Sequence, residues 1–190
     1  LRIFGVGREK KVSIPEGVSV TEIAPRGNLG NTLQFDAGKS RKNMRLGYYD
    51  ALRAIYGLQG KIYYVEQTRE ECYYLKQLVQ AKPEVRAALL EAYELDRSPE
   101  QEMRSFVELL LPLLAVELKL PKDWNYSSLY LAILETAARH CKVHRYRVYT
   151  VQQLLEETKR KIRENGIPEG MPDCVQLILD VKSGDEEEET

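Results

Sequence analysis

Apolar and polar positions follow two different periods along the chain, which divides it into a strand-rich beginning and a helical remainder. Short β-branched runs separated by Gly, Pro and Asn predict strands at 2–6, 10–14, 18–24, 31–36 and 61–66. A short helix is predicted over 46–56, where Gly57 ends it. The first third of the chain is therefore expected to build most of a sheet.

From Thr68 onwards the spacing of apolar residues becomes helical, and capping residues mark where each helix begins. The predicted helices cover 68–81, 83–96, a long segment after Ser98 that includes 106–118, a segment from Asn125 or Ser127 to about 141, and 151–165. The nearly unbroken apolar run 106–118 is expected to be the central buried helix. Pro112 within it predicts a bend.

The last apolar segment, 174–181, reads as a strand because Val175, Leu177 and Leu179 alternate with Gln176 and other residues. A lone strand is unstable, so we expect it to rejoin the N-terminal sheet. The predicted fold class is α+β: a small, mostly antiparallel sheet from both ends of the chain, packed with a bundle of about five helices.

The predicted organisation is one folded unit with four parts. These are a strand-rich part over 1–66, a helical bundle over 67–166, a returning strand over 167–183 and a disordered acidic tail over 184–190.

Composition indicates a globular protein, because 43% of the residues are hydrophobic and 30% are charged. We find no leader sequence at the start and no apolar stretch long enough to span a membrane. Three cysteines form neither a disulfide framework nor a metal-binding spacing. These features lead us to expect a cytoplasmic protein without a membrane role.

The net charge of −1 conceals an uneven distribution. The run Asp185 to Glu189 contributes −5, so the remainder of the chain carries +4. A mildly basic body is compatible with binding to a polyanion, although it does not demand it.

Two segments combine basic and aromatic residues, and they are the strongest functional signal in the sequence. One precedes Tyr48 and Tyr49, and the other is the acid-free stretch 139–149. Arg and Lys can neutralise phosphates, and tyrosine rings can stack on unpaired bases. The predicted nucleic-acid-binding residues are Lys39, Arg41, Lys42, Arg45, Arg139, Lys142, Arg145, Tyr146 and Arg147.

Other motifs are weaker. Gly38-Lys39-Ser40 lacks the glycine that a phosphate-binding loop needs five residues earlier, where Leu33 stands. His140 and His144 have an i, i+4 spacing, but two ligands do not complete a metal site. We therefore predict no metal, no cofactor and no catalytic residue from these motifs.

Three functional hypotheses remain. The first is a non-catalytic nucleic-acid-associated protein that binds DNA or RNA as an accessory subunit of a nucleoprotein complex, with a protein partner. The second is a helical protein-interaction adaptor, in which the apolar stripe of 151–162 packs inward or onto a partner. The third is a metal-dependent nuclease that uses Asp180 and Lys182, with Glu135 or Asp36 as the second acid. We favour the first, and expect no enzymatic activity.

Overall fold

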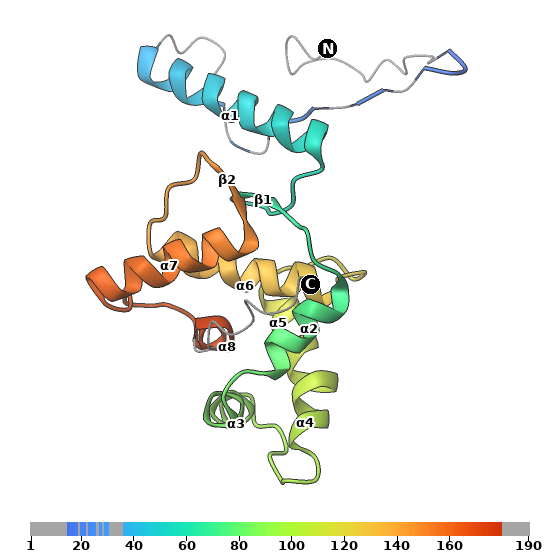
Figure 1. Cartoon of the computed structure of the whole chain (residues 1–190), viewed down its shortest axis with the longest axis vertical. Coiled ribbons are helices and arrows are strands. Elements are labelled where there is room, and N and C mark those ends of the chain that lie inside the picture. Colours follow the sequence, from blue (N-terminus) through green and yellow to red (C-terminus); the bar gives the residue numbers. More distant parts are fainter. Residues whose placement is uncertain are drawn as a thin grey trace, which may run out of the picture. The chain divides into compact units, whose positions relative to one another are not determined.

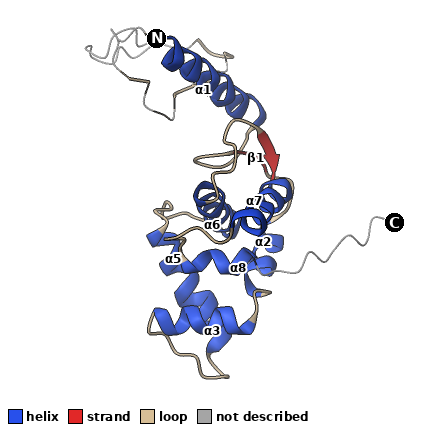
Figure 2. Ribbon diagram, turned by 90° about the vertical axis from the view of Figure 1, so that its left-hand side faces the viewer, coloured by secondary structure: helices blue, strands red, loops and turns tan. Residues whose placement is uncertain are grey.

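The computed structural model describes residues 15–18, 20–21, 23–25, 27, 29–30 and 36–179. The chain divides into two compact units, residues 1–58 and 59–190. In the described part the protein is mostly helical, with one very small sheet (Figures 1 and 2). The division at 58/59 places the predicted strand 61–66 in the second unit, with the helices.

In the first unit the main element is helix α1 (Ala37–Tyr56), which begins earlier than the predicted helix at 46. Asp36 caps it by accepting a hydrogen bond from the backbone N–H of Lys39 at 2.6 Å. Gly57 ends it in the left-handed conformation (φ 65°), as predicted. Of the predicted strand 18–24, the described residues form no strand. The predicted strands 2–6, 10–14 and all but Asp36 of 31–36 lie outside the described residues.

The sheet of the second unit consists of β1 (Tyr64–Glu66) and β2 (Val148–Thr150), which pair in parallel with Val65 opposite Tyr149. The prediction of a mostly antiparallel sheet is therefore wrong. The chain between the two strands is largely helical, and a long crossover of this kind allows parallel pairing.

The helices of the second unit agree with the predicted order, and most of their ends lie within a few residues of the predicted ones. They are α2 (Glu71–Val79), α3 (Pro83–Ala92), α4 (Glu102–Arg104), a π-helical turn (Ser105–Leu110), α5 (Leu111–Glu117), α6 (Tyr126–His140), α7 (Val151–Asn165), a 3₁₀ turn (Asp173–Val175) and α8 (Gln176–Leu179). Reciprocal side-chain caps at Asn125 and Thr150 set the starts of α6 and α7.

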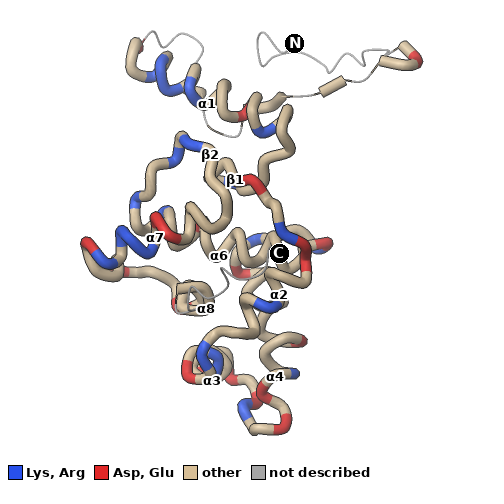
Figure 3. Tube along the Cα trace, viewed as in Figure 1, with Lys and Arg blue, Asp and Glu red and all other residues tan. Residues whose placement is uncertain are grey.

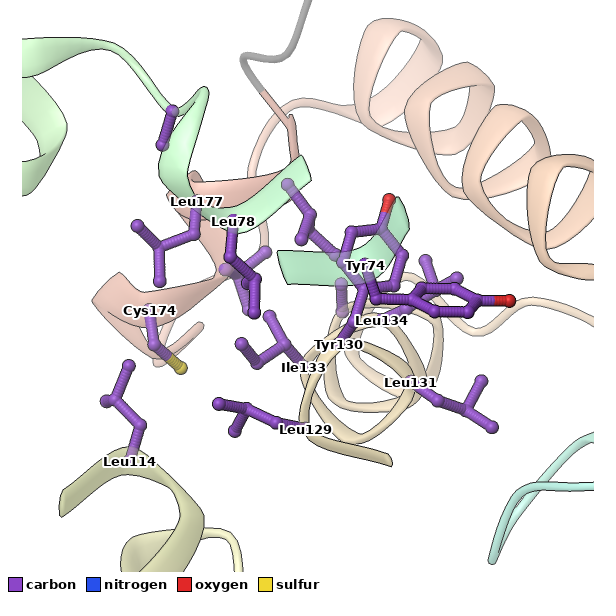
Figure 4. Close-up of a cluster of buried hydrophobic side chains, with 14 of the residues drawn as sticks. Tyr74, Leu78, Leu114, Leu129, Tyr130, Leu131, Ile133, Leu134, Cys174 and Leu177 are labelled. Atoms are coloured by element: carbon purple, nitrogen blue, oxygen red, sulfur yellow. The ribbon is translucent and has the colours of Figure 1, made fainter. Parts of the chain in front are cut away.

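The core of this unit is built around α6 rather than around 106–118 alone. Figure 4 shows Leu129, Ile133 and Leu134 of α6 facing side chains from α2, α5 and the segment 174–177. One face of 106–118 is buried, as predicted, but Leu109, Leu113 and Val116 are 49%, 43% and 75% exposed. The expectation that the whole run is buried is therefore wrong, because only one side of the helix meets the core.

Pro112 is accommodated by a change of helix type. It lacks an N–H and would crowd the carbonyl four residues earlier in a regular α-helix. The chain forms a π-helical turn over Ser105–Leu110 directly before it, and the N–H of Leu111 donates to the carbonyl of Phe106. This wider turn is the distortion that the structure shows at the predicted bend.

The predicted C-terminal strand is wrong over its described part, which is helical. Cys174, Val175, Leu177 and Ile178 are all buried there. These residues are three or four positions apart, as Cys174 and Ile178 are, and this spacing fits one side of a helix. The alternation of apolar residues in the sequence fitted a strand equally well. Helices α2 to α6 thus lie between the two strands of the parallel sheet, but within the described residues no C-terminal strand follows α7 to rejoin it.

Candidate nucleic-acid interface

The first basic segment lies on α1. Lys39, Arg41, Lys42 and Arg45 are all exposed, and Figure 3 colours the Lys and Arg positions of this helix blue. No acid occurs between Ala37 and Tyr49. Within the described part of the chain, Lys39, Arg41 and Lys42 form no ion pair. The N-terminal half of α1, residues 37–47, therefore presents four cations to solvent.

The pattern of burial along α1 explains why Arg41 and Arg45 remain exposed. Leu46, Asp50 and Arg53 are its buried residues, and the side chains of Asp50 and Arg53 form an ion pair at 3.4 Å. At about 100° per residue, Arg41 and Arg45 lie on the side of the helix opposite to these three. Lys39 and Lys42 instead point to the same side as Leu46, and they are exposed in the first turns of the helix.

The second basic segment follows α6. Arg139 and Lys142 are exposed, and Lys142 has a left-handed backbone (φ 54°). The N–H of Val143 donates to the carbonyl of Ala138 at 2.9 Å, and the Val143 side chain is buried. This closes the helix with the Schellman pattern, although a lysine stands where glycine is usual.

Beyond this turn, the segment is bonded to the loop before β1. Arg145 donates through Nε to the carbonyl of Ile62 at 2.9 Å, and the hydroxyl of Tyr63 donates to the carbonyl of Val143 at 3.1 Å. Arg145 also lies over the ring of Tyr146, 5.7 Å from its centroid. Arg145 and Tyr146 are both half-buried. Their side chains therefore help to hold the segment in place.

Tyr149 is also part of the packing. It is buried, and its hydroxyl donates to the carbonyl of His144 at 2.7 Å. Its ring meets that of Tyr63 edge to face, with centroids 6.2 Å apart, and burial raises the pKa of Tyr63 above its ordinary value. Arg147 is exposed and lies over the Tyr149 ring at 5.2 Å. Of the second segment, Arg139, Lys142 and Arg147 face solvent.

The loop that receives Arg145 is itself held by a buried carboxylate. Glu135 of α6 accepts hydrogen bonds from the backbone N–H groups of Lys61, Ile62 and Tyr63 at 2.9, 2.9 and 2.7 Å. Gly60 (φ 94°) allows this approach, since a Cβ there would lie 2.5 Å from Glu135 Oε1. The sequence analysis considered Glu135 only as a metal ligand, and no local pattern reveals its role as an acceptor for a loop more than 70 residues away.

The acids named for the nuclease hypothesis serve structural purposes. Both oxygens of Glu135 accept backbone hydrogen bonds, and Asp36 caps α1. Asp180 and Lys182 lie outside the described residues. His140 ends α6, and His144 follows the turn, so the two histidines do not share a helix face. In residues 36–179 and the short described stretches before them, no three His, Cys, Asp or Glu side chains gather as metal ligands would.

A groove of about 360 Å³ beside β2 was not predicted from the sequence. It is lined by Arg147, Tyr149, Gln153, Glu156, Glu157, Arg160 and Arg163. Its charges are mixed: Arg160 pairs with Glu157 and Glu164, and the hydrogen bond from Arg160 lowers the pKa of Glu157. A pattern of polar residues at 153, 156, 157 and 160 could have indicated this face of α7.

No protein-family model, curated protein or solved structure matches this chain. Among the described residues, none of the helices has both the length and the apolar character needed to cross a bilayer. The function of the protein is therefore inferred from its own residues.

Proposed function

We propose that this protein is a non-catalytic nucleic-acid-associated protein that contacts phosphates through the N-terminal half of α1. The observation that carries this proposal is the exposure of Lys39, Arg41, Lys42 and Arg45 within two turns of one helix, without an acid among them. Lys39, Arg41 and Lys42 form no ion pair within the described residues, so they can neutralise phosphates without first breaking one.

The second segment has a smaller part in the proposed interface. Arg139, Lys142 and Arg147 are exposed and can add phosphate contacts. Arg145 and Tyr146 are occupied by the packing of their own unit. The proposal is thus one of backbone contacts, which position a nucleic acid without reading its sequence. A cytoplasmic accessory subunit of a nucleoprotein complex is the role that suits such an interface.

The test is a titration of labelled single-stranded and duplex oligonucleotides, followed by fluorescence anisotropy at several salt concentrations. Four phosphate contacts predict a slope of log K against log salt of about −3.6 for duplex and about −2.8 for single strands. Arg41→Glu with Arg45→Glu should weaken binding at least tenfold and reduce the steepness of the salt dependence by about two contacts.

The matched control is Lys119→Glu with Lys122→Glu, which changes the net charge equally at two exposed positions of the second unit. It should leave binding nearly unchanged. Absence of binding at low salt, or equal losses in the two double variants, would contradict the proposal.

A helical adaptor without a nucleic-acid role is the second candidate, and the observation that favours it is the exposed aliphatic stripe Leu109, Leu113 and Val116. The stripe first considered for this role, in α7, instead packs inward: Leu154 is buried, and Val151, Leu155 and Ile162 lie against the core. The same titration separates the two functions, since an adaptor predicts no oligonucleotide binding even at low salt.

A further inference from the structure

The C-terminal half of α1, residues 48–56, differs in character from its basic N-terminal half. Tyr48, Ile55 and Tyr56 are 61%, 66% and 70% exposed, and Leu52 is half-buried. Their spacing is i, i+4, i+7 and i+8, which gathers all four on one side of the helix. Exposed apolar side chains scattered singly need no explanation, but four on adjacent turns form a continuous surface typical of an interface.

This surface is not the buried side of α1. Leu46, Asp50 and Arg53 are buried on the other side of the helix. The only charged residues between Leu46 and Gly57 are Asp50 and Arg53, which are paired with each other at 3.4 Å. The apolar surface of 48–56 therefore carries no exposed charge of its own.

We infer that this surface packs antiparallel against the same surface of α1 in a second copy of the chain, around a twofold axis at Leu52. A parallel pair would bring Arg41 beside Arg41 and Arg45 beside Arg45 of the second copy, and like charges at such positions destabilise a helix pair. In an antiparallel pair centred on Leu52, residue 48 of one copy lies opposite residue 56 of the other. The two basic halves then extend away from each other at opposite ends.

The side chains fit this symmetry. Each Leu52 meets its counterpart on the axis, and Tyr48 of each copy lies at the level of Tyr56 of the other. Aromatic pairs of this kind contribute about 0.5–1.5 kcal/mol beyond their buried area. An isologous contact of this type closes at two copies and does not polymerise. An acidic partner helix is less suited to this surface because its charges would find no exposed cation between 48 and 56.

The contact is short. Nine helical residues span about 12 Å between the first and last Cα, and a standard interface buries about 800 Å² on each partner. We therefore expect a dissociation constant in the micromolar range rather than a permanent dimer. The dimer would carry two basic halves of α1, one at each end, but its formation requires no nucleic acid.

The first experiment is sedimentation equilibrium of the full chain from about 1 to about 300 µM, after nuclease treatment. The mass should rise with concentration from 21.9 kDa towards twice that value, 43.8 kDa. Leu52→Asp with Ile55→Asp should hold the chain at monomer mass, with unchanged helical circular dichroism. The control is Val116→Asp, which places one aspartate on an apolar, 75% exposed position of α5 and should leave the dimer intact.

The orientation is tested by cross-linking in a Cys72→Ser background, since Cys72 is exposed whereas Cys141 and Cys174 are buried. Oxidation of a mixture of Tyr48→Cys and Tyr56→Cys copies should yield the mixed dimer, and Leu52→Cys should cross-link to itself. A monomer over the whole concentration range overturns the inference, as does loss of the dimer in Val116→Asp. Self-cross-linking of Tyr48→Cys without the mixed product would overturn the antiparallel arrangement. The Arg41→Glu and Arg45→Glu variant should still dimerise, so failure of nucleic-acid binding and failure of dimerisation are distinct results.

Discussion

The two basic-aromatic segments look alike in sequence, yet their side chains have different environments in the structure. On α1, Lys39, Arg41, Lys42 and Arg45 are exposed along an open helix. In the second segment, Arg145 donates to the carbonyl of Ile62 and Tyr149 is buried. The comparison shows that composition identifies candidate cations, whereas the surrounding packing decides which of them are available to a ligand.

The environments of the two segments differ because the segments lie in different elements of the fold. The first segment lies within a single helix, where its four cations are exposed. The second must turn out of α6, cross the loop 60–63 and enter β2 as the partner of β1. A crossing of that kind needs side chains that satisfy buried carbonyls, and Arg and Tyr donate such hydrogen bonds. The same residue types are therefore exposed to solvent in the first segment and form structural hydrogen bonds in the second.

The largest predicted effect tests whether the loop beneath the second segment is a rigid support. Glu135→Ala leaves three backbone N–H groups of Lys61, Ile62 and Tyr63 without their acceptor. We expect a loss of about 3–5 kcal/mol in the free energy of unfolding, measured by urea denaturation. Glu108→Ala removes an exposed carboxylate that pairs with Arg104, and it should cost less than about 1 kcal/mol. Equal costs for the two variants would show that Glu135 is not a structural anchor.

An intermediate effect separates the two segments directly. Arg145→Ala should destabilise the protein by about 1–2 kcal/mol, because the carbonyl of Ile62 loses its donor. Arg41→Ala should change stability by no more than about 0.5 kcal/mol, since its side chain is exposed. Oligonucleotide binding should show the opposite order, with the larger loss in Arg41→Ala.

Arg145→Lys is the control for charge. It keeps the cation but loses the Nε donor, so it should remain destabilised. If Arg145→Ala instead weakened binding more than Arg41→Ala while leaving stability unchanged, the contrast between the two segments would be reversed.

The smallest effect concerns the groove beside Arg147. The hydrogen bond from Arg160 lowers the pKa of Glu157 below its ordinary value of 4.5. The carboxylate is therefore ionised in the folded protein at a lower pH than in the unfolded chain, and its stabilising contribution is present at neutral pH and lost as the pH falls through this range. Glu157→Gln should cost a few tenths of a kcal/mol, about 0.5 at most, at pH 7. The difference from the unsubstituted protein in urea midpoint should shrink as the pH is lowered below 4.5. A difference that grows on acidification would contradict this assignment.

The sequence predicted those features that depend on residues close together in the chain. The reciprocal cap of Thr150 and Gln153 predicted the start of α7, and Gly57 predicted the end of α1. It failed where two local patterns were equally compatible with the residues. Cys174 to Leu179 alternates like a strand but also matches one side of a helix, and packing against α2, α3 and α6 favours the helix.

Some residues of the candidate site could likewise be predicted from the sequence, and others could not. The four cations of α1 could be found from the sequence because they lie close together in the chain, and all four are exposed. The hydrogen bonds of Glu135 to the loop 61–63 could not, because they join residues more than 70 positions apart. The open outer side of α5 was also hidden, since Leu109, Leu113 and Val116 resemble buried residues in the apolar run.

By itself, the amino-acid sequence determined where most helices of the second unit begin and end, and it located the two concentrations of positive charge, because caps, turns and charge runs act over a few residues. Only the tertiary structure decided that β1 and β2 pair in parallel, that α6 forms the centre of the core and that Arg145 is bound while Arg41 is exposed. These outcomes depend on which distant surfaces exclude water together, and many distant partners can satisfy the same local pattern.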